Sequence, residues 1–347
     1  MADSPPSTGA INKKLQYRPP SEPGFDARRD ALMAGDRAAL SRAITLLESH
    51  RAPDREIAAR LVSWADEQSG RHSFRLGISG SPGVGKSTFI EAFGMALVER
   101  GHKLAVLAID PSSSLSGGSI LGDKTRMEQL VKAPNAYIRP SPNQGALGGV
   151  NRSTRESLLL CEAAGFDFII VETVGVGQSE LAVHGMTDAF LLLAQPGAGD
   201  ELQGIKRGVL ELADLIVVNK LDVLPQAVRQ TAAQLKQALH LAPARADQWN
   251  RPILTSAALT GQHIEQIVTS VEDYRQHLLD STYFTQGRER QRQKWLGELI
   301  QSELLYDLKQ ANLTDRTVDP KPGKVFARAK ELLQSFYQTQ HTKQPPS

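Results

Sequence analysis

Residues 80–88 have the composition and spacing of a loop that binds nucleotide phosphates. A short apolar stretch at 75–79 precedes this segment, and an amphipathic pattern from Ser87 to Leu97 follows it, so it joins a predicted strand to a predicted helix. Its glycines let successive backbone N–H groups surround a β-phosphate, and the helix N-terminus adds its dipole. In this pattern the Lys86 ammonium reaches the β- and γ-phosphates, and the Ser87 hydroxyl ligates Mg²⁺. The predicted phosphate-binding residues are Gly80, Ser81, Pro82, Gly83, Val84, Gly85, Lys86, Ser87 and Thr88.

A second segment, at 219–222, indicates which base is bound. It reads Asn-Lys-Leu-Asp after a predicted strand at 215–218, and Asn-Lys-x-Asp at a strand end is the guanine-reading element of G proteins. The Asp222 carboxylate can accept hydrogen bonds from guanine N1–H and the exocyclic amine, whereas adenine offers neither donor there. Backbone N–H groups of residues 256–258 can face guanine O6. We therefore predict GTP as the nucleotide. The predicted base-binding residues are Asn219, Lys220, Asp222, Ser256, Ala257 and Ala258.

Three carboxylates are candidates for the Mg²⁺ shell and for catalysis. Asp110 directly follows a predicted strand at 104–109, Glu172 follows another at 168–171, and Asp123 lies in the segment between these strands. Most small G proteins have Asp at the position of Glu172, so this chain departs from them there. The simpler alternatives are that Asp110 caps a helix and that Asp123 is a solvated loop carboxylate. The predicted metal ligands are Ser87, Asp110, Asp123 and Glu172, and the predicted catalytic residues are Lys86, Asp110 and Glu172.

Short, almost fully apolar stretches alternate with longer helical patterns between residues 74 and 282. Strands that are apolar on both faces belong inside a sheet that helices cover on each side. We therefore predict an α/β fold, a three-layer P-loop GTPase with a mainly parallel sheet and helical extensions at both ends. The predicted strands are residues 75–79, 104–109, 168–171, 189–194, 215–218 and 253–254.

The rest of the chain divides around this GTPase domain at 74–282. Residues 1–24 are rich in proline and predict a disordered lead-in. Residues 25–73 predict a helical extension, in which Asp36 can cap a helix. Residues 283–338 predict a helical hairpin, with helices at 286–310 and 324–336, and 339–347 form a tail. An appended hairpin suits either a dimerisation arm or packing on its own domain.

Composition excludes several classes of protein. The 347 residues carry 40 Lys and Arg against 38 Asp and Glu, a net charge of +2, so the sequence favours neither nucleic acid nor a membrane as partner. A single cysteine, Cys161, excludes an internal disulfide framework and a cysteine-rich metal centre. No apolar run approaches the roughly 18–20 residues of a transmembrane helix, and the N-terminus lacks the apolar stretch of a signal peptide. We expect a cytoplasmic protein.

Three motifs beyond the phosphate-binding loop narrow the assignment. They are Asp-Pro-Ser-Ser at 110–113, Gly-Asp-Lys-Thr-Arg-Met at 122–127 and Glu-Thr-Val-Gly-Val-Gly-Gln-Ser-Glu at 172–180. In this order they resemble the G proteins associated with methylmalonyl-CoA mutase, some formerly labelled arginine/ornithine transport-system kinases. This family is one of the G proteins that mature metallo-cofactor enzymes. Residues 35–44 and the C-terminal hairpin also resemble it.

This resemblance implies a homodimeric GTPase that acts as a chaperone for an adenosylcobalamin-dependent acyl-CoA mutase such as methylmalonyl-CoA mutase. The GTPase would gate cofactor loading, protect the mutase from inactivation, dimerise through its C-terminal helices, and hydrolyse GTP slowly until the partner stimulates it. The resemblance also makes 195–206 a switch that relays nucleotide state, although a solvated loop is the simpler alternative. Gln178 invites a water-positioning role by analogy, but it lies out of the usual register. The predicted switch residues are Gly175, Gly177, Gln178, Asp200 and Lys206.

Two other functions use the same phosphate-binding loop. A nickel-delivery GTPase needs Cys or His ligands, and neither the lone Cys161 nor the eight histidines show paired ligand spacing. A P-loop kinase of a transport-binding protein needs an acceptor site, and none is evident, while residues 219–222 favour GTP. Both remain alternatives.

Overall fold

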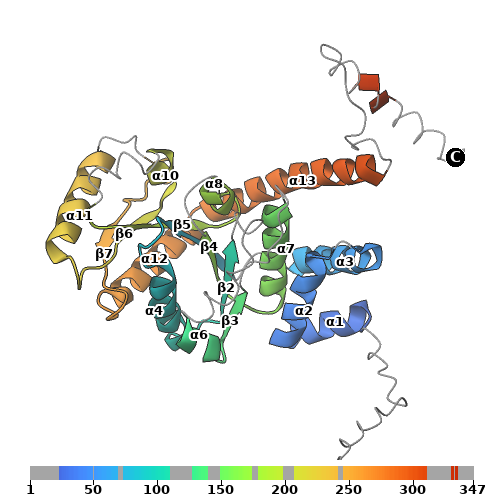
Figure 1. Cartoon of the computed structure of the whole chain (residues 1–347), viewed down its shortest axis with the longest axis horizontal. Coiled ribbons are helices and arrows are strands. Elements are labelled where there is room, and N and C mark those ends of the chain that lie inside the picture. Colours follow the sequence, from blue (N-terminus) through green and yellow to red (C-terminus); the bar gives the residue numbers. More distant parts are fainter. Residues whose placement is uncertain are drawn as a thin grey trace, which may run out of the picture.

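Seven parallel strands form one sheet with helices on both faces (Figure 1). The order across the sheet is β3-β2-β4-β1-β5-β6-β7, and every neighbouring pair is parallel. This is the predicted three-layer α/β architecture. The strands are β1 (Phe74–Gly80), β2 (Leu104–Ile109), β3 (Ala136–Arg139), β4 (Phe168–Thr173), β5 (Ala189–Ala194), β6 (Leu215–Val218) and β7 (Ile253–Thr255).

The structure is a computed structural model that describes residues 23–49, 51–68, 73–109, 127–139, 149–173, 179–197, 207–240 and 245–310, together with 330, 331, 333 and 334. Residues 1–22 of the predicted lead-in at 1–24, and the tail at 339–347, lie outside these ranges. The second helix of the predicted hairpin does too, apart from those last four residues, which are helical. The helices are α1 (Phe25–Met33), α2 (Arg37–Leu47), α3 (Ala52–Gln68), α4 (Lys86–Glu99), α6 (Glu128–Lys132), α7 (Gly149–Ala163), α8 (Ser179–His184), α10 (Arg207–Leu212), α11 (Pro225–His240), α12 (Ile264–Asp280) and α13 (Tyr283–Gln310).

Each face of the sheet has its own hydrophobic cluster. Along β5, Leu191 and Leu193 pack with residues of α4, α6 and α12, whereas Phe190 and Leu192 pack with residues of α2, α3, α7 and α11. Alternate side chains of a strand point to opposite faces, so a strand buried on both sides must be apolar throughout. That requirement is why continuous apolar runs identified these strands in the sequence.

All six predicted strands are present, with ends that differ by no more than two residues. The prediction missed β3, a four-residue strand at the edge of the sheet in which only Ala136 and Tyr137 are buried. Ile138 and Arg139 are half-buried, so β3 lacks the continuous apolar pattern of the central strands.

The N-terminal helices pack on α7 and so on one face of the sheet. The Asp36 carboxylate caps α2 as predicted, because its Oδ1 accepts hydrogen bonds from the N–H groups of Ala38 (2.7 Å) and Ala39 (3.1 Å). Leu40 and Ile44 are fully buried in the cluster that α7 shares.

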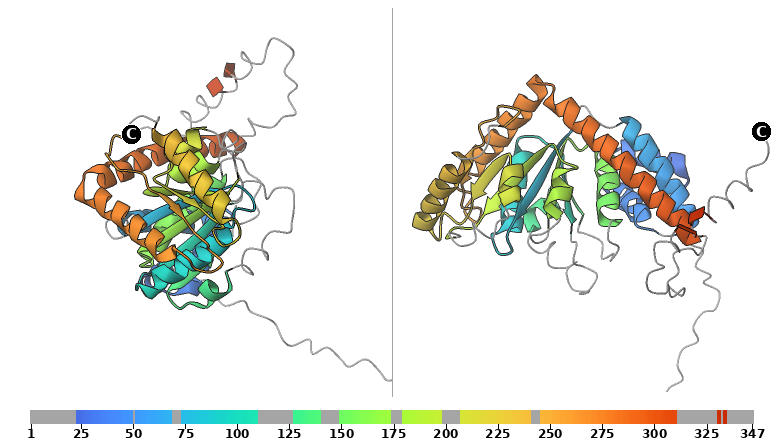
Figure 2. Two further views of the ribbon diagram at one scale, coloured as in Figure 1. Left: turned by 90° about the vertical axis from the view of Figure 1, so that its left-hand side faces the viewer. Right: turned by 90° about the horizontal axis from the view of Figure 1, so that it is seen from above.

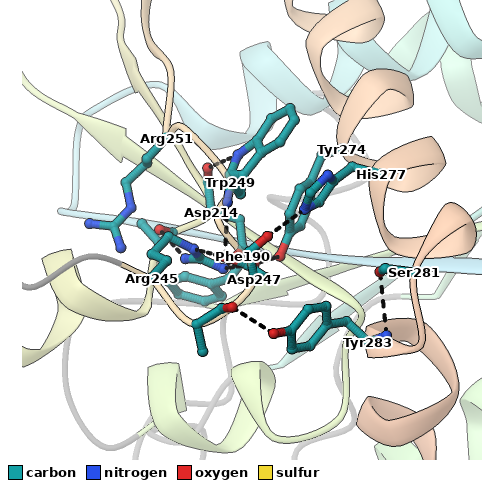
Figure 3. Close-up of polar contacts among 12 residues, drawn as sticks. Phe190, Asp214, Arg245, Asp247, Trp249, Arg251, Tyr274, His277, Ser281 and Tyr283 are labelled. Carbon is teal, nitrogen blue, oxygen red and sulfur yellow. Dashed lines mark hydrogen bonds and ion pairs between the residues drawn. The ribbon is translucent and has the colours of Figure 1, made fainter.

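A buried polar network joins β6 to the helices that follow the last strand (Figure 3). Asp214, which precedes β6, accepts hydrogen bonds from Arg245 Nη2 (2.6 Å), the Tyr274 hydroxyl (2.8 Å) and Phe190 N–H (2.7 Å). Burial raises the pKa of Asp214, and Arg245 opposes that shift. Tyr283, at the start of α13, donates to the Ala246 carbonyl (2.5 Å), so the network also fixes where α13 begins.

Arg288 anchors α13 to the amino-terminal ends of the strands. Its guanidinium is buried, with Nη2 2.6 Å from Asp188 Oδ2 and Nη1 3.0 Å from Glu162 Oε1. Arg75 of β1 also pairs with Glu162, with Nη2 2.7 Å from Oε2. Farther along, α13 runs beside α3 (Figure 2), where Arg55 stacks 3.6 Å from the Tyr306 ring centroid. One face of α13 therefore packs on its own chain.

We expect this cluster to make the fold sensitive to acid. Burial opposes ionisation of Glu162, but Arg75 and Arg288 outweigh it and hold its pKa at about 2, below its usual 4.5. A carboxyl whose pKa is lower in the folded state stabilises the fold above its unfolded pKa, and that stability is lost as the pH falls toward the folded pKa. Chemical denaturation should show stability declining between about pH 5 and pH 2, and Glu162→Gln should weaken this dependence. An unchanged pH dependence in Glu162→Gln would contradict the assignment.

Candidate nucleotide-binding site

The predicted phosphate-binding loop joins β1 to α4, at the carboxyl edge of the sheet (Figure 1). Gly83 and Gly85 have φ of +78° and +94°, in the left-handed region that favours glycine. A Cβ on Gly80 would lie 2.5 Å from the Leu193 carbonyl oxygen, so β5 leaves room there only for glycine. The sequence pattern therefore has a steric basis in the fold.

Lys86 folds back across the loop that precedes it. Its Nζ donates to the carbonyl oxygens of Gly80 (2.7 Å) and Ser81 (3.3 Å). Burial lowers the pKa of Lys86 below its ordinary value, and the charges of Glu172 and Glu180 oppose this shift. The ammonium thus lies at the mouth of the loop, among groups that an anionic phosphate could replace.

Glu172 lies in β4, beside the loop strand. It is 4% exposed and pairs in register with Ile78 of β1 and Ala108 of β2. The next residue, Thr173, donates from its hydroxyl to Ser79 Oγ (2.8 Å), which ties the ends of β4 and β1 together. Ser87, in the first turn of α4, is half-buried.

Glu180 was not among the site residues predicted from the sequence. It lies in the first turn of α8, is 2% exposed, and acts electrostatically on Lys86. A signal for it was present, because it ends the motif at 172–180. Spacing alone, however, could not show that the start of α8 faces the phosphate-binding loop.

Asn219 connects the base-reading segment to both neighbouring loops. Its Nδ2 donates to the Val84 carbonyl (3.0 Å), and its Oδ1 accepts from Ser256 Oγ (3.0 Å) and Ala258 N–H (3.1 Å). The side chain is buried. Its amide therefore positions the phosphate and base loops against each other.

The other predicted base-reading residues lie close to Asn219 in the sequence or in the segment that contacts it. Lys220 adopts a left-handed backbone conformation, with φ of +68°, and Asp222 is exposed in the turn that follows β6. The N–H groups of residues 256–258 all have acceptors within the protein: Val218 O, Gln262 O and Asn219 Oδ1. A contact from these groups to guanine O6 would have to compete with one of those bonds, the longest of which is Ala257 N–H to Gln262 O (3.2 Å).

The structure brings together the predicted residues of the phosphate loop, Glu172, Asn219, Lys220, Asp222 and residues 256–258, all at the carboxyl ends of parallel strands, where ligands bind in folds of this kind. The remaining predicted site residues lie outside the described ranges. They are Asp110, Asp123, Gly175, Gly177, Gln178, Asp200 and Lys206.

Comparisons with known proteins find relatives that match most of this chain. The sequence profile described as "Methylmalonyl Co-A mutase-associated GTPase MeaB" matches residues 40–313. The GTPase ArgK of Escherichia coli K12 is 46% identical over 278 residues, which are 80% of this chain and 84% of that protein. The mitochondrial methylmalonic aciduria type A homolog of Mus musculus is 43% identical over 328 residues, 89% of this chain and 79% of that protein.

The fold is also similar to a solved structure, the crystal structure of a LAO/AO transport system kinase. The two share 34% sequence identity and a TM-score of 0.70, and the match covers 91% of this chain and 97% of that one. Within the described residues, no helix is long and apolar enough to cross a membrane.

Proposed function

The chain belongs to the family of methylmalonyl-CoA mutase-associated GTPases, and we propose that it is a Mg²⁺-dependent GTPase that serves as a chaperone for an adenosylcobalamin-dependent acyl-CoA mutase in the cytoplasm. The observation that carries the proposal is the match of the family profile across both the phosphate-binding loop and the base-reading segment. In this role GTP binding and hydrolysis gate cofactor loading and protect the mutase from inactivation.

The donor chemistry of the site fits Mg²⁺. This ion prefers hard oxygen ligands, and the Ser87 hydroxyl and the Glu172 carboxylate are such groups. When bound, Mg²⁺ neutralises charge on the β- and γ-phosphate oxygens. Lys86 supplies the protein's own positive charge to the same oxygens, and Asp110 and Asp123 complete the proposed carboxylate set.

Glu172→Ala should reduce GTP hydrolysis more than it reduces GDP affinity. The carboxylate is proposed to act on Mg²⁺ and on the γ-phosphate or the attacking water, which GDP lacks or holds only loosely. We expect a loss of on the order of 100-fold in turnover, the usual contribution of one positioned group, and a change of less than about threefold in GDP affinity. Single-turnover hydrolysis and GDP titration measure the two effects. Equal losses in both would make Glu172 a structural residue.

A labelled-nucleotide experiment separates this function from the kinase alternative. With γ-labelled GTP, a GTPase releases the label as free phosphate, whereas a kinase transfers it to an acceptor protein. The nickel-delivery alternative needs a metal site of another kind, and the described residues contain no group of three or more His, Cys, Asp or Glu side chains placed to hold a metal ion. Label on protein, rather than in phosphate, would contradict the proposal.

The proposed homodimer forms through an apolar stripe on α13. Leu296, Ile300 and Leu304 are 60%, 60% and 38% exposed and lie four residues apart, so they share one side of the helix. Another side of the helix packs near α3, where Arg55 stacks on Tyr306. A stripe of this kind on a helix that leaves the sheet suits burial against the same stripe of a second copy.

Ile300→Glu should therefore convert a dimer to a monomer. Each change occurs twice in a two-fold dimer, and burying one such side chain is worth about 1.5–3 kcal/mol, so the dimer should weaken by at least about 100-fold. Light scattering after size-exclusion chromatography measures the mass. Met33→Glu, which changes an exposed residue of α1, serves as the control and should leave the dimer intact. A dimer that survives Ile300→Glu would place the interface elsewhere.

The proposed function also includes a switch at residues 195–206. This segment follows β5, whose residues flank the phosphate-binding loop strand, and contains Asp200 and Lys206. We propose that it relays the nucleotide state to the mutase.

A further inference from the structure

A cavity of about 500 Å³ lies between α7 and the first half of α13, at the edge of the sheet opposite the phosphate-binding loop. Figure 2 shows α13 passing over α7 and toward α3 there. The volume of the cavity is in the range of sites that hold small molecules. Leu159, Leu279 and Phe284 provide apolar wall, and arginines provide most of the polar wall.

Among the described residues, Arg155 is the arginine of this wall that forms no ion pair. The residue is 4% exposed, and its Nη1 and Nη2 donate only to the carbonyl oxygens of Gln291 (3.1 Å) and Gly185 (3.0 Å). In contrast, Arg75 and Arg288 pair with Glu162 and Asp188 in the same region. Arg155 therefore adds an unbalanced positive charge to the cavity.

Burial lowers the pKa of Arg155, with the charge of Glu298 opposing the shift and that of Arg75 adding to it. A buried charge that hydrogen-bonds only to neutral carbonyls is costly, and an oxyanion removes that cost through charge-assisted bonds. Glu298 also lies 4.0 Å from Lys294, so its negative charge acts on two cations.

Two N–H donors in this wall also have no acceptor among the described residues. They are Arg155 Nε and Trp295 Nε1, and both atoms are shielded from bulk water. Each buried donor without a partner costs about 1–3 kcal/mol. Both residues line the same cavity, so one ligand that enters it can accept hydrogen bonds from both groups once their side chains turn toward it.

We propose that this cavity binds a small organic oxyanion, with a carboxylate or phosphate head on Arg155 and Trp295 and an apolar body against Phe284 and Leu279. The site is distinct from the nucleotide site. Arg75 lies near the start of β1, whereas the phosphate-binding loop begins at the end of this strand, at Gly80, five residues and roughly 17 Å of extended chain away. The proposal thus stands or falls separately from the GTPase function.

The test uses the full chain loaded with GDP and Mg²⁺, so that the nucleotide site is filled. Benzoate, phenyl phosphate and the uncharged benzamide are titrated calorimetrically. We expect at least one of the two anions to bind, at least about tenfold more tightly than benzamide, because the uncharged probe has no oxyanion for Arg155. Which anion binds identifies the head group.

Variants then locate the binding. Arg155→Met should weaken binding of the anion by about tenfold or more. Trp295→Phe, which keeps an aromatic ring but removes the N–H, should weaken it by about fivefold. Arg290→Met, an equivalent change at an exposed arginine of α13, should change affinity less than twofold. If Arg155→Met fails to fold, Trp295→Phe and the benzamide comparison decide. The proposal is overturned if neither anion binds, if benzamide binds as tightly, or if both Arg155→Met and Trp295→Phe keep wild-type affinity.

Discussion

Lys86→Ala should nearly abolish GTP hydrolysis and weaken GTP binding. In the structure Nζ already spans the mouth of the phosphate-binding loop, at 2.7 Å from the Gly80 carbonyl. Burial lowers the pKa of this ammonium group. A phosphate would exchange these neutral acceptors for charged oxygens, which form stronger bonds. Since the charge on those oxygens grows toward the transition state, removing this preorganised donor should cost on the order of 100- to 1000-fold in turnover.

Steady-state phosphate release measures the loss, and nucleotide titration measures the affinity. Lys103→Ala is the matched control, because Lys103 is exposed just before β2, at the opposite edge of the sheet. It should keep wild-type rates. Wild-type turnover in Lys86→Ala would refute the assignment of the phosphate-binding loop.

Asp222→Asn should change the preferred base from guanine to xanthine. The proposed carboxylate accepts from guanine N1–H and the exocyclic amine, whereas an amide presents an N–H donor that suits the 2-oxo group of xanthine. Loss of charge-assisted bonds worth about 2–3 kcal/mol corresponds to roughly 30- to 150-fold weaker GTP binding. The exposed position of Asp222 in the turn after β6 allows the change without disturbing buried Asn219.

Competition between GTP and xanthosine triphosphate measures the change in preference. Asp273→Asn, an equivalent substitution at an exposed position of α12, should leave the preference for GTP intact. If GTP affinity is unchanged in Asp222→Asn, that carboxylate does not read the base.

Local sequence patterns were sufficient to predict the central strands and the cap of one helix. The central strands are buried on both faces, so their apolar runs were visible in sequence, and Asp36 could be recognised as a helix cap because its partners are two and three residues away. β3 was missed for the converse reason. It is short, lies at the sheet edge, and exposes part of Ile138 and Arg139.

Contacts between distant residues could not be predicted in this way. Asn219 was expected at the base, yet its amide bonds Val84, 135 residues earlier, and Ala258, 39 residues later. The Arg288 cluster joins α13 to Glu162 and Asp188 across separations of 126 and 100 residues. No local spacing encodes such pairs, because the order of strands in the sheet brings them together.

The most direct test of the proposed function is the rate of GTP hydrolysis by the purified full chain, measured alone and with increasing amounts of adenosylcobalamin-dependent methylmalonyl-CoA mutase. An unrelated acyl-CoA enzyme serves as the control partner. The proposal predicts slow hydrolysis by the chain alone and a saturable increase with the mutase, with no increase from the control. A rate that stays the same at every concentration of mutase would contradict it.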